Sequence, residues 1–280
     1  MLKVLESLEN FFQEVFKQGS GQSPEVLGFG TASRGLLPSE RNQNMLFNLV
    51  ELIRGKLMPA EGSAAMGLLY AGGVLLCIAV GYLLGSLNPA VLVARVGFRE
   101  DIKRAGHGNA EAIDIADAYG KRAGIVTAAL NFAKGFAASL LGLFIWEMNG
   151  LAISGLFALL GAMFPCFNRF KGGRGAEVMA GMILAVSILT TGFPIVFLLL
   201  LLIFLIVIIG TRFLSLGVIM TGVFYPLILR GFSGAQAGLC LACAVLTTLF
   251  VVARHWDSMQ RIWNRKEPQL KFPWNKNQED

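Results

Sequence analysis

Long apolar runs separated by short polar stretches dominate the pattern of the chain from about residue 67 onwards. Most of these runs approach the roughly 20 residues that an α-helix needs to cross a bilayer. The pattern predicts membrane-spanning helices at about 67–85, 123–146, 151–168, 178–191, 195–210, 214–229 and 235–253. We therefore expect an all-α, polytopic helical membrane protein with about seven transmembrane helices.

The first 65 residues follow a different pattern. In MLKVLESLENFFQEVFKQ, apolar residues recur at helical spacing with charged residues between them, which predicts an amphipathic helix lying on the membrane surface or on protein. A linker rich in Gly, Ser and Pro follows, and then a second amphipathic stretch, NMLFNLVELIRGKLM. The expected organisation is an amphipathic and linker extension over 1–65, a membrane domain over 66–267 and a polar tail over 268–280.

Composition supports a membrane protein. Apolar residues make up 55% of the chain and charged residues 15%, against about 25% charge in a typical soluble domain. The net charge of +6 does not indicate nucleic acid binding, because excess Lys and Arg in a membrane protein usually mark cytoplasmic loops. Cys240 and Cys243 have CxxC spacing, but they lie in an apolar run and are expected to pack rather than bind metal.

The distribution of Lys and Arg decides how the run 178–209 is divided. It could form one tilted helix, or two short helices broken at Gly192 and Pro194. Two helices place the basic loops 86–122 and 169–177 and the basic tail on one side, opposite the loops near 147–150 and 192–194, which hold no Lys or Arg. The positive-inside rule therefore favours seven spans with the C-terminus in the cytoplasm. The N-terminal extension would then lie outside, although it carries basic residues of its own.

Five segments rich in glycine and basic or polar residues fall on the predicted cytoplasmic face. They are GYLLGSLNPA (81–90), RAGHGNAEAIDI (104–115), FKGGRGAE (170–177), TRFLSLG (211–217) and ARHWDSMQRIW (253–263). Glycine lets backbone N–H groups approach a ligand, and Lys or Arg supplies a countercharge, which suits phosphate. Basic loops could also serve topology alone, but the three glycines of FKGGRG favour an anion site because topology requires no glycine.

In and directly after these segments, five stretches resemble, in order, the signature segments of the bacterial acyl-phosphate:glycerol-3-phosphate acyltransferases. They are GSLNPAVLVARV, GHGNAEAIDI, FKGGRG, TRFLSLG and RHWDSMQRIW. These are seven-span inner-membrane enzymes of phospholipid synthesis, and the resemblance covers about residues 67–267. It implies transfer of a fatty acyl group from acyl phosphate to the 1-hydroxyl of glycerol 3-phosphate, which forms lysophosphatidic acid. It also implies active-site loops in the cytoplasm and no metal or other cofactor.

The resemblance implies acyl phosphate, glycerol 3-phosphate and membrane lipid as partners, with the enzyme that makes acyl phosphate as a further candidate. It assigns catalytic roles to Ser86, Lys171 and His255. It assigns substrate binding to Arg95, His107, Gly108, Asn109, Gly172, Gly173, Arg174, Gly175, Arg212 and Ser215. Ser86 could instead be a helix-end cap, and His255 could be an ordinary interfacial residue. Lys134, inside a predicted span, suggests function, with snorkelling to the surface as the alternative.

Several positions depart from the pattern of this family. In the second segment, His107, Glu111, Ile113 and Asp114 stand where Ser, Gly, Thr and Asn are usual. The remaining departures are Asn131 for Asp, Ala162 for His, Glu177 for a small residue, Val178 for Thr and Ser258 for Asn. Hydrogen-bond donors for phosphate are lost, while Glu111 and Asp114 add charge that disfavours an anion.

These departures leave three hypotheses. The first is a working acyltransferase, with or without a changed donor or acceptor, in which His107 is a candidate general base. The second is a non-catalytic relative that binds a lipid precursor or a partner enzyme. The third is a small-anion transporter, which the clustering of segments on one face disfavours because transporters bind substrate near the midplane of the bilayer.

Overall fold

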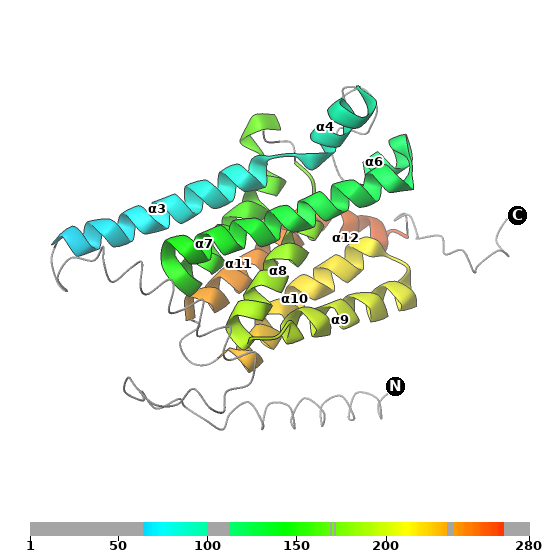
Figure 1. Ribbon diagram of the computed structural model, residues 1–280. Coiled ribbons are helices and arrows are strands. Elements are labelled where there is room, and N and C mark those ends of the chain that lie inside the picture. Colours follow the sequence, from blue (N-terminus) through cyan, green and yellow to red (C-terminus); the bar gives the residue numbers. More distant parts are fainter. Residues whose placement is uncertain (1–63, 100–111, 169, 171, 234–237, 266–280) are drawn as a thin grey trace, which may run out of the picture.

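The computed structural model describes residues 64–99, 112–168, 170, 172–233 and 238–265, and its regular elements in these ranges are all helices (Figure 1). The predicted amphipathic extension before residue 64 and the tail over 268–280 lie outside the described residues. The long helices are α3 (Ala64–Ser86), α7 (Lys121–Met163), α8 (Ala176–Thr191), α9 (Ile195–Thr211), α10 (Leu214–Phe232) and α11 (Gly238–Arg254). They pack as a bundle around one apolar core.

Helix α7 is a helical hairpin, because its chain reverses at Trp146 and Glu147, where the backbone angles are not helical. The Ser154 hydroxyl donates to the Ala138 carbonyl at 2.7 Å. These two residues would lie about 24 Å apart along a continuous helix. The two arms, 121–145 and 148–163, therefore run antiparallel and correspond to the predicted spans 123–146 and 151–168. The second arm ends at Met163 rather than near 168, with a 3₁₀ turn at Cys166–Asn168 beyond Pro165.

The predicted break between two helices near Gly192 is confirmed. Helix α8 ends at Thr191, Gly192 adopts a left-handed conformation with φ 72°, and α9 begins at Ile195. The Ser187 hydroxyl accepts from the N–H groups of Val196 and Phe197 at 3.0 and 3.3 Å. These bonds satisfy two of the N–H groups that the start of α9 would otherwise leave without a partner.

Small residues let α3 pack closely on the second arm of α7. Gly81 and Gly85 lie directly against the backbone of Ser154 and Ala158, so that a Cβ atom at either glycine would collide with a carbonyl oxygen. Gly161 approaches the backbone of α3 in the same way. Such contacts are typical of helices that associate inside a membrane, and they bring the C-terminus of α3 to the end of the second arm.

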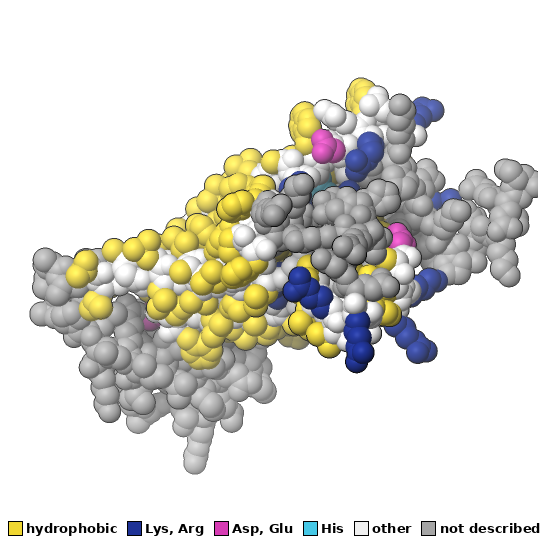
Figure 2. Space-filling model, turned by 90° about the horizontal axis from the view of Figure 1, so that it is seen from above, with side chains coloured by type: hydrophobic (Ala, Val, Ile, Leu, Met, Phe, Trp, Pro, Cys, Tyr) yellow, Lys and Arg dark blue, Asp and Glu magenta, His cyan; other side chains and the backbone are white. Residues whose placement is uncertain are grey.

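The segment 86–122, which the sequence suggested was a loop, contains helices. It holds α4 (Pro89–Val93), a π-helical turn (Ala94–Phe98) and α6 (Ala112–Tyr119). At the end of α11 the chain bends by 54° into α12 (Trp256–Trp263). The elements α4, α6 and α12 lie toward the same end of the bundle in Figure 1, and Lys and Arg side chains gather toward one end of the face in Figure 2.

Among the described helices, three are long and apolar enough by themselves to span a membrane: α3, α7 and α10. The bent pair of α11 and α12 raises this number to four, whereas α8 and α9 are apolar but shorter. All of the predicted spans coincide with helices or arms of helices, which places the chain among integral helical membrane proteins. The count of seven spans stays a prediction.

Candidate functional site

Ser86 is the last residue of α3, and the sequence around it explains its position. Pro89 has no N–H and disfavours a helical conformation at the preceding residue. Asn88 is accordingly extended, with φ −104° and ψ 103°, and its side-chain oxygen accepts from the Ala90 N–H at 3.0 Å to begin α4. The Ser86 side chain is 1% exposed, and its hydroxyl has no partner within the described part of the chain. A buried polar group without a partner is costly, which is typical of a site awaiting a ligand.

Lys134, on the first arm of α7, is directed at the end of α3. Its Nζ atom donates to the carbonyl oxygens of Gly85 at 2.9 Å and Leu87 at 2.8 Å. Carbonyl groups at a helix C-terminus lack partners within the helix and carry partial negative charge. The intramembrane cation is therefore a helix cap, and it holds the peptide groups on both sides of Ser86.

The glycine-rich loop, residues 172–175, connects the second arm of α7 to α8. A Cβ atom on Gly172 would collide with the Ala162 carbonyl, and Gly175 has φ 74°, a conformation that glycine adopts without strain. Both positions explain why this loop contains glycine. The Arg254 guanidinium, at the end of α11, braces the loop by donating to the carbonyl oxygens of Gly172 at 2.8 Å and Gly173 at 3.3 Å.

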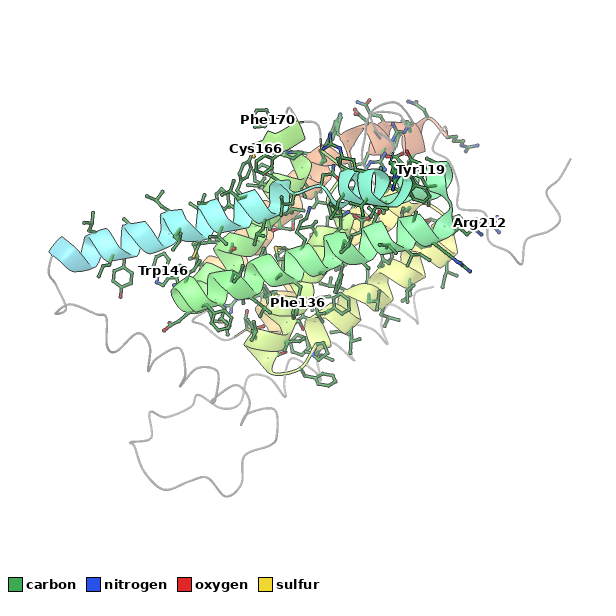
Figure 3. The ribbon with its side chains drawn as sticks, turned by 45° about the horizontal axis from the view of Figure 1, so that its top comes forward. Tyr119, Phe136, Trp146, Cys166, Phe170 and Arg212 are labelled. Atoms are coloured by element: carbon green, nitrogen blue, oxygen red, sulfur yellow. The ribbon has the colours of Figure 1, made fainter. Side chains whose placement is uncertain are left out.

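Arg174 joins the third and fourth polar segments. Its Nη1 atom lies 3.4 Å from the hydroxyl of Ser215, a buried residue in the first turn of α10. Figure 3 shows Arg212, which precedes α10, at the same end of the bundle as Tyr119 and far from Trp146. The structure thus brings the third and fourth segments together at one end of the bundle.

A narrow polar cleft of about 20 Å³ lies between the end of α3, the first arm of α7 and the glycine-rich loop. A cavity of this size holds about one water molecule. Its polar side chains are those of Ser86, Asn88, Asn131, Lys134, Arg174 and Glu177, and the remaining lining comes from Gly85, Leu87, Ala162, Pro165, Gly173, Gly175 and Val178. Lys134 and Glu177 carry opposite charges and attract each other within the cleft. Two cations and one carboxylate therefore line one narrow, partly open cleft.

A larger apolar groove of about 640 Å³ adjoins the polar cleft. Ser86, Leu87, Asn88 and Lys134 line both cavities. The groove continues between α3, α4 and the first arm of α7, and Phe167 also lines it. Its other lining residues are Leu84, Pro89, Val91, Leu92, Arg95, Leu130, Ala133 and Ala137. Several of its apolar residues are exposed on the protein surface, so this groove suits a long apolar molecule entering from lipid.

His255 is buried, with 1% exposure, between α11 and α12. Its Nδ1 atom lies 2.9 Å from the Val251 carbonyl, and a hydrogen bond there requires the proton to be on Nδ1 because a carbonyl oxygen can only accept. Nearby, the Arg261 guanidinium donates to the hydroxyl of buried Ser258 at 2.9 Å. His255 lines neither the polar cleft nor the apolar groove.

The structure brings some of the predicted site residues together and leaves others apart. Ser86, Gly173, Arg174 and Gly175 line the polar cleft, and Arg95 lines the groove. Gly172 belongs to the glycine-rich loop and Ser215 contacts Arg174 of that loop, whereas Arg212 and His255 lie outside both cavities. The predictions for His107, Gly108, Asn109 and Lys171 fall outside the described residues.

Two contributors to the site were missed by the sequence interpretation. Arg254 stands in the last polar segment beside His255, but the resemblance assigns it no role in the site. Asn88 was not singled out, although Asn before Pro commonly begins a helix.

In the described residues, no group of three or more His, Cys, Asp or Glu side chains is placed to hold a metal ion.

Comparison with known proteins gives a consistent result. Residues 75–265 match the family model described as glycerol-3-phosphate acyltransferase. The chain is 31% identical over 199 residues to the glycerol-3-phosphate acyltransferase of Bacillus subtilis (strain 168), covering 71% of this chain and 98% of that protein. It is 33% identical over 199 residues to that of Geobacillus kaustophilus (strain HTA426), covering 71% and 96%.

The fold also resembles solved structures. The crystal structure of PlsY (YgiH), an integral membrane glycerol 3-phosphate acyltransferase, in its glycerol 3-phosphate form superimposes with a TM-score of 0.62 and 28% identity, covering 71% of this chain and 96% of that chain. The lysophosphatidic acid form of the same enzyme gives a TM-score of 0.61 and 27% identity, covering 71% and 95%. The similarity therefore covers nearly the whole of that enzyme and leaves the N-terminal part of this chain outside it.

Proposed function

The chain belongs to the glycerol-3-phosphate acyltransferase family, and we propose that the polar cleft and the apolar groove that meet at Ser86 together form its active site. The protein transfers an acyl group from acyl phosphate to glycerol 3-phosphate and forms lysophosphatidic acid. Both substrates carry phosphate and one carries a fatty chain, so the site must combine cationic and apolar surfaces.

The observation that carries this assignment is the set of residues shared by the two cavities. Ser86, Leu87, Asn88 and Lys134 line both of them. In an acyl phosphate, the reactive carbonyl carbon joins the fatty chain to the phosphate. A donor whose chain lies in the groove and whose phosphate lies beside Lys134 and Arg174 therefore has its carbonyl group at Ser86. The groove suits the chain because ligand sites for apolar molecules are concave and mostly apolar.

The chemistry follows from this placement. The acyl phosphate is already activated, so the site needs mainly to align the acceptor hydroxyl with the carbonyl carbon and to stabilise the charge that develops. The cleft is too narrow for a phosphoryl group as it stands, and binding requires the flexible side chains of Arg174 and Glu177 to move apart. Arg174 suits phosphate because its guanidinium donates several hydrogen bonds in a planar arrangement.

We further propose that the protein spans a bacterial inner membrane and that its active site opens to the cytoplasm. The basic side chains gathered at one end of the bundle favour this orientation under the positive-inside rule. It would give water-soluble glycerol 3-phosphate access from the cytoplasm and would let an enzyme that makes acyl phosphate deliver the donor at the same surface. Residues 66–267 would form the catalytic domain, with 1–65 as an extension.

The direct test uses the full chain purified in detergent and supplied with acyl phosphate and glycerol 3-phosphate, with lysophosphatidic acid and released phosphate measured separately. We expect equal amounts of both products. The variants Lys171→Ala and His255→Ala test the other two predicted catalytic roles, and unchanged lysophosphatidic acid formation would show those roles to be wrong. Donor binding without turnover would instead support a non-catalytic relative. The matched control is Arg230→Gln, which removes an exposed basic residue from the last turn of α10. Arg230 does not line the cleft, so this change should leave activity unchanged.

A further inference from the structure

Arg254 holds two successive carbonyl groups of the glycine-rich loop with one side chain. Its terminal nitrogen lies 2.8 Å from the Gly172 carbonyl oxygen, and its Nε atom lies 3.3 Å from the Gly173 carbonyl oxygen. The guanidinium is a rigid planar group, so two such bonds define the orientation of both peptide units. Arg254 itself lines neither cavity, whereas Gly173 lines the polar cleft.

The orientation of these peptides determines where one N–H group points. A trans peptide is planar, and its N–H points opposite to its C=O. No cis peptide occurs in the described residues. Because the Gly172 carbonyl is turned toward Arg254, the Gly173 N–H is turned away from Arg254, and Gly173 is a residue that lines the cleft. No residue that the structure describes accepts a hydrogen bond from this N–H.

The Ser86 hydroxyl provides an independent observation at the same cleft. It is 1% exposed, lines the cleft and has no partner among the described residues. A cleft of about 20 Å³ accommodates about one oxygen atom. An oxygen atom placed there would satisfy both donors, and Ser86 marks the junction between the polar cleft and the apolar groove. The oxygen at such a junction is the carbonyl oxygen of an acyl phosphate.

We propose that the Gly173 N–H and the Ser86 hydroxyl form the oxyanion hole of this enzyme and that Arg254 is the positioning residue that orients it. This inference rests on the proposed function. As the acceptor hydroxyl oxygen bonds to the carbonyl carbon, the electron pair of the C=O bond moves onto the oxygen held by these two donors. When the pair returns, the bond from carbon to the phosphate oxygen breaks, and phosphate leaves with the proton of the hydroxyl.

The test compares Arg254→Gln and Arg254→Lys with the wild-type chain in the same lysophosphatidic acid assay. Loss of one oxyanion-hole donor typically lowers kcat by about 10²–10³-fold. We expect Arg254→Gln to lower kcat by about a hundredfold with less than a threefold change in KM for either substrate. In Arg254→Lys, the lysine can bind only one of the two carbonyl groups at a time, so this variant should have less than a tenth of the wild-type kcat. Its retained charge also keeps the test usable if the glutamine variant does not fold.

A merely structural role predicts a different result. It would lower thermal stability and the amount of active protein without changing the kcat of the folded fraction, which is quantified by the stoichiometry of radiolabelled donor binding without glycerol 3-phosphate. The double variant Arg254→Gln/Ser86→Ala should lose little more than the worse single variant, because both changes affect one oxygen atom. Wild-type kcat in folded Arg254→Lys, or fully additive losses, would overturn the oxyanion hole. Absence of activity in the wild-type chain would instead overturn the proposed function.

Discussion

The Nζ atom of Lys134 lies 2.8 Å from the carbonyl oxygen of Leu87, just beyond the end of helix α3. The same ammonium lies 2.9 Å from the Gly85 carbonyl, so one cation holds the chain on both sides of Ser86. Lysine inside a membrane span usually marks a functional site. Here it acts partly through the backbone, by fixing the place where the polar cleft meets the apolar groove.

Replacing Lys134 by Met should impair both stability and activity. Two carbonyl groups lose a charged donor, and an unsatisfied buried group costs about 1–3 kcal/mol. We expect a lower thermal unfolding temperature in detergent and at least a tenfold loss of kcat. The matched control is Lys121→Met, at the exposed first residue of α7. Equal thermal stability of the Lys134 variant and the wild type would contradict the capping role.

Replacing Ser86 by Ala should separate function from stability. The hydroxyl is buried and unpartnered among the described residues, so its removal eliminates a desolvation cost. We expect kcat to fall by about a hundredfold while the unfolding temperature stays equal or rises. Activity and thermal unfolding measured on one preparation check both parts. A marked fall in stability would show that the hydroxyl supports the fold instead of serving a ligand.

Larger side chains at Gly81 or Gly85 should separate α3 from the second arm of α7. A Cβ atom at either position collides with backbone, which side-chain rotation cannot relieve. Overpacking of this kind costs about 1–3 kcal/mol. Gly72→Val is the control, because a Cβ atom at Gly72 meets no atom within 4 Å. Thermal unfolding should rank Gly81→Val and Gly85→Val well below wild type and Gly72→Val close to it.

Replacing Ala137 by Trp should change the preference for acyl chain length. Ala137 lines the groove about one helical turn deeper along α7 than Lys134, on the membrane side. A large side chain there should shorten the space for the fatty chain. We expect kcat/KM to fall about tenfold or more for long-chain acyl phosphates and little for short-chain ones. Leu201→Trp, on the exposed face of α9, is the control for a bulky aromatic residue on the protein surface. An unchanged preference would place the chain elsewhere.

Neutralising Glu177 should strengthen binding of glycerol 3-phosphate. The carboxylate lines the polar cleft, where it repels a phosphate and competes for Lys134. We expect Glu177→Gln to lower KM for glycerol 3-phosphate by about three- to tenfold, consistent with a repulsion on the order of 1 kcal/mol in a partly solvated site. Asp117→Asn, at an exposed position of α6, should have no effect. A raised KM would indicate that Glu177 contacts the acceptor favourably.

Sequence reasoning recovered the helices and the family because both depend on local information. The length of an apolar run is set by the thickness of the bilayer, and Gly192 and Pro194 end helices through their own backbone preferences. The polar segments carried the resemblance that the family match confirms, and four of the predicted site residues, Ser86, Gly173, Arg174 and Gly175, line one cleft.

The hydrogen bonds that build the site could not be predicted in this way. Lys134 meets the carbonyl group of Gly85 across 49 positions of sequence, and Arg254 meets that of Gly172 across 82. Every peptide carries the same carbonyl group, so residue types alone do not tell which one a cation will reach. The same limit applies to His255, which packs between α11 and α12, and its catalytic role stays a prediction.

The amino-acid sequence by itself determined which segments enter the membrane, where the helices break and which polar residues are available at one face, because these follow from hydrophobicity and backbone preferences over a few residues. The tertiary structure alone decided that α7 folds into a hairpin, that glycines bring α3 against its second arm, and that a narrow polar cleft opens beside an apolar groove. Those features depend on how closely distant backbones can approach, and only the packed bundle specifies that distance.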